Sequence, residues 1–215
     1  MASSAIELNE NDAEAHAARG YLRTKALGEF QQAEADLVRA LELAPNSADA
    51  LGWYAHLFQR EEQYDRAFEE MATSIEIDPL APGRRNGNAF GALASGDYAL
   101  AIQEAELALR LEPTITMPYL SLGLANLLTN RFDECLSVLG ERFPGVRAMC
   151  QYSQGDEAAA TGTIDGLKGT LSSTDEPRSN IEMISYRDIG VYLSLIHISA
   201  PTRRYAISYA VFCLK

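Results

Sequence analysis

The side chains best suited to metal binding or nucleophilic chemistry are few in this sequence. His16 and His56 lie far apart, and neither has a cysteine or carboxylate at the short spacing that a zinc site requires. Each is interpreted as an exposed or groove-lining side chain. The cysteines Cys135, Cys150 and Cys213 form no Cys-x-x-Cys pair. This odd, sparse set predicts no disulfide framework and favours a reducing, cytoplasmic environment, with Cys135 as a buried thiol and Cys150 without an assigned partner.

No motif of a catalytic site is present either. The glycines around Gly91 and Gly96 do not form a phosphate-binding loop after a strand, and no Gly-x-Ser-x-Gly, kinase or Walker pattern occurs. Acidic residues such as Glu61-Glu62, Glu69-Glu70 and Glu104 are interpreted as solvated charge on helices. The sequence therefore predicts no catalytic residue, no metal and no cofactor, in a protein that is not itself an enzyme.

The charge balance restricts the class of partner. The chain of 215 residues has 18 basic and 30 acidic side chains, for a net charge of −12. This excess of acid argues against nucleic acid, whose affinity comes largely from neutralised phosphates, and against an anionic membrane surface. No apolar run is long enough for a membrane-spanning helix, and the first residues lack the pattern of a secretory signal. We expect protein or peptide partners and no membrane insertion.

One set of positions recurs at a period of 34 residues. The recurring positions are aromatic at Phe30, Tyr64, Tyr98 and Phe132, small at Ala33, Ala67, Ala101 and Cys135, small again at Ala40, Ser74 and Ala108, and proline at Pro45, Pro79 and Pro113. A further small column lies at Gly20, Ala55, Ala89 and Gly123. Its first interval is 35, so we place one extra residue in the turn near Ala26-Leu27-Gly28. Regular spacing of this kind predicts a structural repeat.

Each unit of the repeat has the pattern of two amphipathic helices joined by a short turn. In the second unit, Ala48–Glu61 is one predicted helix and Tyr64–Ile77 is its partner. The small residues Ala55 and Ala67 would allow the two backbones to approach closely. Pro79 cannot continue a helix, so it ends the second one.

Two segments are close to the consensus of a known family: Ala40-Leu41-Glu42-Leu43-Ala44-Pro45-Asn46 and Gly96-Asp97-Tyr98-Ala99-Leu100-Ala101-Ile102. With the columns above, they resemble the tetratricopeptide repeat (TPR) family over four aligned units. The resemblance implies an all-α fold, an α-solenoid of antiparallel helical hairpins wound into a superhelix. We assign residues 12–140 to four hairpins, the last of which is degenerate at its end.

The segments on either side of the array depart from the pattern. Residues 1–11 resemble the tail of a truncated preceding repeat, so we expect the natural protein to extend further at its N-terminus. Residues 141–192 are interpreted as a degenerate fifth hairpin, then a loop at Lys168–Asn180 that is rich in glycine, serine and threonine, then the start of a further helix at Ile181.

The last segment, residues 193–215, differs from everything before it. It contains three basic residues and no acidic one, and its apolar, β-rich blocks conflict with the helical repeat. Its two constant blocks resemble the conceptual translation of a sequencing-library adapter. We interpret it as an adapter-derived artefact, and therefore give no functional weight to His197, Arg203 or Cys213.

The family resemblance also indicates a binding surface. Stacked hairpins of this family form a concave face lined by the first helix of each unit. By this resemblance Ala17, Gly52, Asn86 and Leu120 form an inward column. The predicted peptide-binding groove consists of Tyr21, Lys25, Trp53, His56, Arg60, Asn86, Phe90 and Leu124.

Aromatic and arginine side chains are the usual anchors of binding energy. For Trp53, packing between repeats is an equal alternative. Some family members clamp a peptide's C-terminal carboxylate with lysine and asparagine. Here Ala17 and Tyr21 stand at the first clamp positions and Trp53 at a third, so we do not expect that clamp.

A narrower resemblance concerns the context of the array. Trp53-Tyr54-Ala55, Ile77-Asp78-Pro79-Leu80 and the long first turn are similar to the TPR region of bacterial multidomain signalling regulators. The leading hypothesis is a protein–protein interaction scaffold from such a regulator. The alternatives are the substrate-recruiting region of an enzyme (a nucleotide cyclase, kinase or transferase) whose catalytic domain is not in this sequence, and a spacer or self-association module.

Overall fold

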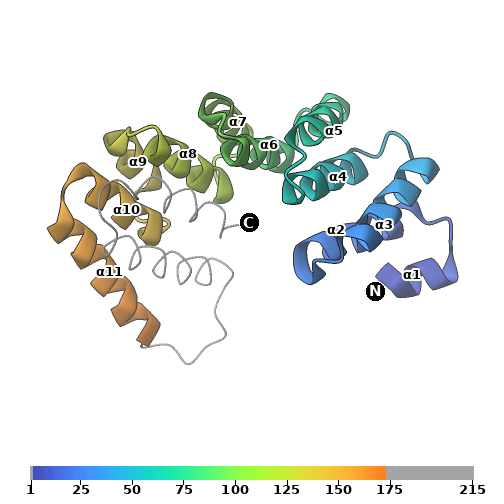
Figure 1. Ribbon diagram of the computed structural model, residues 1–215, viewed down its shortest axis with the longest axis horizontal. Coiled ribbons are helices and arrows are strands. Elements are labelled where there is room, and N and C mark those ends of the chain that lie inside the picture. The colour runs from blue at the N-terminus through green and yellow to red at the C-terminus, as the bar shows by residue number, and fades with distance from the viewer. Residues whose placement is uncertain (1, 173–215) are drawn as a thin grey trace.

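A computed structural model describes residues 2–172 of the chain, and in this part every regular element is helical. The elements are α1 (Ala2–Leu8), α2 (Ala13–Leu22), a π-helical turn η1 (Arg23–Leu27), α3 (Phe30–Leu43), α4 (Ala48–Arg60), α5 (Tyr64–Ile77), α6 (Pro82–Ser95), α7 (Tyr98–Leu111), α8 (Met117–Leu128), α9 (Phe132–Leu139), α10 (Pro144–Gln154) and α11 (Glu157–Ser172). The helices pack as consecutive hairpins that stack into an arc (Figure 1). The predicted helix beginning at Ile181 and the adapter-like segment 193–215 lie outside the described residues.

Local sequence explains where the helices begin and end. Ser47 Oγ accepts a hydrogen bond from the backbone N–H of Ala50 (3.3 Å), and Asp97 does the same for Leu100 (3.0 Å). Each of these side chains satisfies a donor that the first turn of a helix leaves free. Gly96 follows α6 with a positive φ of 88°, a conformation that glycine adopts without strain. Gly96 and Asp97 together therefore form the turn between α6 and α7.

The predicted small columns are the contact points within each hairpin. Ala33, Ala67, Ala101 and Cys135 are all 0% exposed. At Gly123 on α8, an added Cβ would lie 2.5 Å from Leu139 Cδ2 on α9, so glycine is needed there for the two helices to approach. The all-α hairpin solenoid predicted from the period is confirmed.

The extra residue of the first unit is absorbed within the helix. Directly after α2 the helix continues in the wider π-helical geometry of η1. The chain then turns at Gly28, whose φ is 67°. A single π-helical turn is the usual way for a helix to accept one inserted residue. The sequence placed the insertion near Ala26-Leu27-Gly28, and η1 overlaps that segment.

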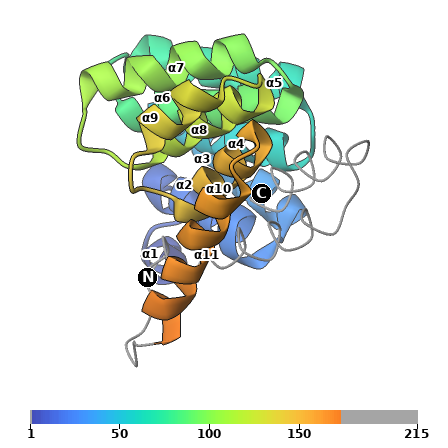
Figure 2. The same cartoon turned by 90° about the vertical axis from the view of Figure 1, so that its left-hand side faces the viewer.

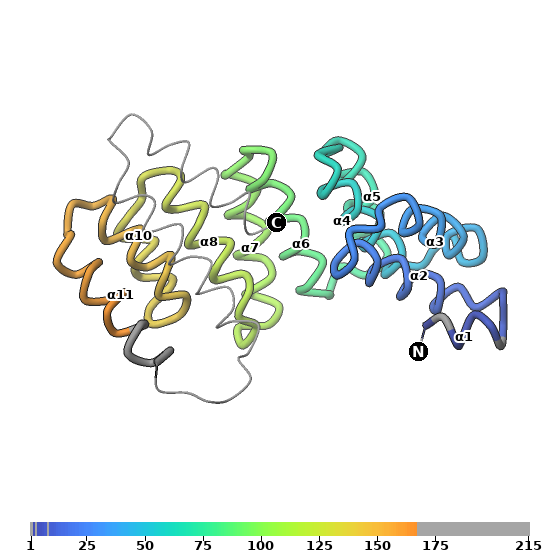
Figure 3. The backbone as a smooth tube through the Cα atoms, turned by 60° about the horizontal axis from the view of Figure 1, so that its bottom comes forward, coloured from blue at the N-terminus to red at the C-terminus, as the bar shows by residue number. Residues whose placement is uncertain are grey.

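Helices α10 and α11 pack on each other at the end of the described stack opposite α1 (Figure 3), and this end faces the viewer in Figure 2. Helix α11 continues to Ser172, so the loop predicted from Lys168 is wrong for residues 168–172. The reason is that Gly166 and its polar neighbours only weaken a helix, and they do not end it as a proline does. The assignment of residues 141–192 to a degenerate fifth hairpin, a loop and the start of a further helix remains a proposal.

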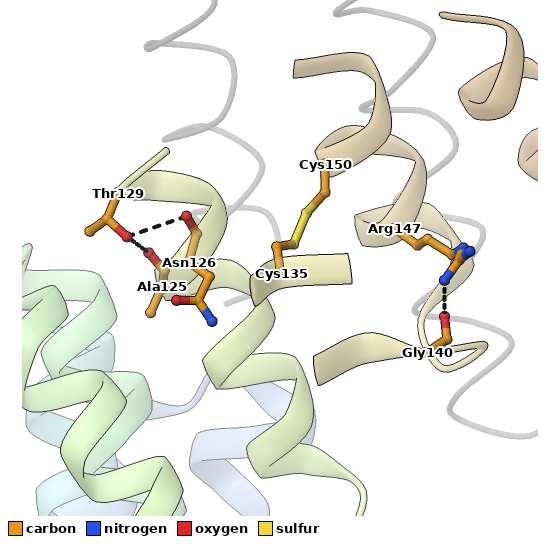
Figure 4. Close-up of a disulfide and its surroundings, with 7 residues drawn as sticks. All are labelled: Ala125, Asn126, Thr129, Cys135, Gly140, Arg147 and Cys150. Atoms are coloured by element: carbon orange, nitrogen blue, oxygen red, sulfur yellow. Dashed lines mark hydrogen bonds between the residues drawn. A yellow bond between two sulfur atoms is a disulfide. The ribbon is translucent and has the colours of Figure 1, made fainter. Parts of the chain in front are cut away.

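Cys135 on α9 and Cys150 on α10 form a disulfide (Figure 4). Their Cα atoms are 6.4 Å apart, and both residues are 0% exposed. The predicted burial of Cys135 is confirmed, but the prediction that it is a thiol was wrong, and Cys150, which the sequence left without an assigned partner, is bonded to it. Helix α9 ends early, at Leu139, and the chain returns at once as α10, which brings the two sulfur atoms together. Because two of the three cysteines are bonded to each other, the cysteine count no longer supports a reducing environment.

Replacing Ala67 with leucine should destabilise the array by about 1–3 kcal/mol, because the added side chain has no room between α4 and α5. Thermal unfolding checks this. The matched control is Ala72→Leu on the exposed side of the same helix, which should leave the melting temperature nearly unchanged. Equal stability of the two variants would contradict the close approach at Ala67.

The disulfide closes a chain separation of 15 residues, so losing it should cost about 3 kcal/mol of unfolding free energy. We expect Cys150→Ala, made in a Cys213→Ala background, to unfold at lower denaturant concentration than the background alone. Alkylation of the unfolded, unreduced background protein should label neither Cys135 nor Cys150. Labelling of both would show that the bond is absent.

Candidate functional site

Helices α2, α4 and α6 converge on a pocket of about 270 Å³. Its lining includes Tyr21, Gly52, Trp53, His56, Met71 and Arg84. Several of the other lining residues are small, namely Ala48, Ala81 and Gly83. Gly52, on the helix between the other two, contributes only its backbone to the wall, and a Cβ added there would lie 3.3 Å from Ser74 Oγ on α5.

Two aromatic rings form one side of the pocket. The rings of Tyr21 and Trp53 stack with centroids 5.1 Å apart and planes 24° apart. Trp53 also packs against the buried Ala17, Ala40 and Ala50. The two roles considered for Trp53 are therefore compatible, because the residue joins the first two repeats and exposes part of its ring to the pocket.

The ring of His56 is fixed by a short chain of hydrogen bonds. Gln59 Nε2 donates to the carbonyl oxygen of Gly87 (3.1 Å), so Gln59 Oε1 faces His56 Nδ1 (3.1 Å). His56 Nδ1 must then be the donor, which leaves Nε2 as an acceptor. Removal of the ring from water, with a smaller contribution from the charge of Lys25, lowers the pKa of His56 to about 4. The imidazole is thus neutral at pH 7.

Two cations lie beside the aromatic pair. The Nζ atom of Lys25, on η1, is 5.9 Å from the centroid of the Tyr21 ring. Desolvation, followed by the positive charge of Arg60, lowers the pKa of Lys25. Within residues 2–172, no carboxylate forms an ion pair with Lys25 or Arg60.

Arg84, on the opposite side of the pocket, is held by acids of its own. Its guanidinium contacts Asp49 (2.6 Å) and Asp78 (2.7 Å), and Nε donates to Ser74 Oγ (2.9 Å). These contacts connect α6 to α4 and to the end of α5. Arg84 is therefore a structural wall of the pocket, and its charge is already neutralised.

Comparison with known proteins identifies the fold. Residues 13–47 match the family model described as tetratricopeptide repeat. The structure superposes with a TM-score of 0.67 on a tetratricopeptide repeat protein from Parabacteroides merdae, at 12% identity, over 98% of this chain and 90% of that one. The fold is a tetratricopeptide-repeat solenoid.

Two other solved structures are similar to this TPR array. Pseudomonas aeruginosa pilF is 21% identical with a TM-score of 0.62, over 94% of this chain and 90% of that one. YrrB, described as a TPR protein with an unusual peptide-binding site, is 18% identical with a TM-score of 0.56, over 77% of this chain and 89% of that one. Identities this low show the fold alone. No curated protein sequence is significantly similar to the chain.

The predicted groove residues of the TPR array fall into two groups. Tyr21, Trp53 and His56 line the pocket, with Lys25 and Arg60 beside them. The remaining three lie further along the stack.

Asn86 Oδ1 accepts a hydrogen bond from Ser121 Oγ (3.0 Å), and Phe90 packs against the core. Leu124 is only 1% exposed, so it is a core residue and presents no binding surface. The resemblance placed it inward correctly, but the neighbouring hairpin covers it.

Two other predictions about polar residues were wrong because each side chain is buried against a partner on the other helix of its own hairpin. His16 is 8% exposed and lies 3.4 Å from Asp36 Oδ1, in a cluster with Arg19 and Arg23. Burial would raise the pKa of Asp36, but the hydrogen bonds and charges of these partners hold it below its ordinary value. Glu104 is 5% exposed and its carboxylate is 3.3 Å from Arg85. Neither His16 nor Glu104 is a solvated side chain.

Sequence reasoning missed two of the pocket residues, Met71 and Arg84. Met71 belongs to a second helix, α5, where the family pattern indicates packing and no contact with a ligand. Arg84 lies near the start of α6, and its only sequence signal is a basic residue one turn into a first helix. That signal does not distinguish a binding residue from one paired with nearby acids.

The depressed pKa of His56 predicts a pH effect on stability. Between pH 6.5 and 4 the unfolded chain binds a proton at His56 that the folded protein does not, so stability falls as the pH falls, by up to about 1.4 kcal/mol per pH unit. Replacing His56 with asparagine, whose amide nitrogen can take the place of Nδ1, should remove this component. Denaturant titrations of both proteins at several pH values measure it, and parallel pH profiles would refute it.

Proposed function

We propose that this TPR array is a protein–protein interaction scaffold that binds a peptide or protein partner on the face formed by α2, α4 and α6. The observation that supports this most directly is the pocket at the Tyr21–Trp53 pair. Large, stiff aromatic side chains that are partly exposed at a concave site are typical anchors of protein interfaces. Residues 2–172 contain no helix that is long and apolar enough to cross a membrane.

The dimensions of the pocket favour a peptide over a small metabolite. Ligand pockets for small molecules are usually about 300–1,000 Å³ and enclose most of the ligand. A pocket of about 270 Å³ that opens onto a longer face suits one side chain of a larger partner. Asn86 and Phe90 on α6 would then contact the same partner further along.

The proposal also covers the larger protein to which the array belongs and its location in the cell. We infer a cytoplasmic portion of a larger bacterial signalling regulator, from the Trp53-Tyr54-Ala55 segment and the long first turn, which η1 now accounts for. The disulfide gives this location no support. Recruitment of a substrate to an enzyme encoded elsewhere in the same gene is the alternative, and the same face would serve it.

Binding should depend on the concave face. Trp53→Ala and Arg60→Ala should each weaken the affinity for a partner recovered by pull-down by about 1–2 kcal/mol, because each removes an anchor. Isothermal titration with the purified partner measures this. Arg60 is exposed, so its loss tests the surface without disturbing the core.

The matched control is Glu69→Ala, an exposed acid on the outer helix α5. Glu104 on the outer helix α7 does not suit this purpose, because it is buried. The affinity of Glu69→Ala for the partner should equal that of the unmodified protein. Loss of binding in Glu69→Ala, with full binding retained by the two groove variants, would move the interface to the convex side.

A further inference from the structure

We propose that the partner carries an aspartate or glutamate side chain next to an apolar residue, with the carboxylate held between Lys25 and Arg60 and the apolar side chain in the pocket beside Tyr21 and Trp53. This inference rests on the proposed function and specifies the chemistry of the ligand. It differs from the C-terminal clamp of the family, because the recognised group is a side chain within the peptide.

The first argument is the electrostatic state of the two cations. The chain has a net charge of −12, yet Lys25 and Arg60 lie on η1 and α4, two elements that contact each other, and neither has an ion-pair partner among residues 2–172. Arg84, across the pocket, contacts two acids. A bound carboxylate would neutralise the repulsion between Lys25 and Arg60, and two charge-assisted hydrogen bonds are available for it.

The second argument is how Lys25 reaches this place. It lies on η1, the turn that absorbs the extra residue of the first unit, one turn after Tyr21. One residue of an α-helix corresponds to about 100° of rotation. The wider turn therefore changes the direction of the side chains that follow α2, and Lys25 Nζ comes to lie 5.9 Å from the Tyr21 ring centroid, near Arg60 of the next unit.

The third argument is the character of the pocket next to the cations. Tyr21, Trp53 and Met71 supply apolar walls, and His56 is neutral, so it adds no charge. The pocket's only carboxylate, from Asp49, is already paired with Arg84. An apolar side chain would bury surface there without leaving a charge unpaired. An acidic residue beside an aromatic or aliphatic one combines the two requirements.

The test is a selection from a library of random 12-residue peptides displayed between fixed flanking sequences, so that no free C-terminus is presented. The full-length protein is compared with a Lys25→Glu/Arg60→Glu variant. The matched control is Arg110→Glu/Arg131→Glu, which changes the net charge equally at two exposed positions away from the pocket. Circular dichroism and thermal melting establish that all three proteins are folded.

We expect peptides selected by the unmodified protein to be enriched at least threefold in aspartate or glutamate adjacent to an aromatic or aliphatic residue. The enrichment should persist for the control and disappear, or change to lysine and arginine, for Lys25→Glu/Arg60→Glu. Changing the acid of one selected peptide to its amide should weaken binding to the unmodified protein at least tenfold, and should not weaken binding to the charge-reversed variant.

The possible failures are distinct. Specific peptides without a preference for acid, or with a preference that survives charge reversal at Lys25 and Arg60, would overturn this inference and leave the scaffold function standing. An equal loss in the control variant would attribute the preference to overall charge and overturn it as well. Selection of no specific peptide would count against both the inference and the proposed function.

Discussion

The close approach of two helices through small side chains is the contact on which the rest of this structure depends. Ala33, Ala67 and Ala101 are completely buried at the same position of successive hairpins. Short side chains allow the backbones to pack closely, and the aromatic residues of the repeat then cover the joint between the helices. Because each hairpin has the same crossing, each stacks on the previous one in the same way, and an extended curved face results. A large residue at any of these positions would disturb both its own hairpin and the stacking of the next.

The candidate site arises where the repeat is irregular. A strictly periodic array would place equivalent side chains in equivalent surroundings, and no single unit would differ from the others. Here η1 interrupts the first unit, Gly52 in the second contributes only backbone to the wall, and Arg84 fixes the start of the third to its neighbours. Three departures from the repeat therefore meet at one point on the face, around the stacked rings of Tyr21 and Trp53.

The sequence predicted most of the fold because its signals are local and repeated. The bounds of α5, Tyr64 and Ile77, follow from an aromatic column and a proline that recur in each unit. The site was only partly predictable, since the missing information concerns which side chains meet across helices, both within a hairpin and between hairpins. The burial of His16 depends on Asp36, and that of Glu104 on Arg85, each on another helix. A family pattern indicates which way Leu124 points, but it does not indicate that a neighbouring hairpin covers it.

The bond between Cys135 and Cys150 has a consequence for how the stack opens. In a one-dimensional array each hairpin is held mainly by its neighbours, so local opening separates one hairpin from the next. The cross-link joins α9 of the fourth hairpin to α10. Helix α10 cannot separate from α9 while the bond is intact, so any local opening that involves one of these helices involves the other. The bond thus makes two helices of successive hairpins a single unit of opening.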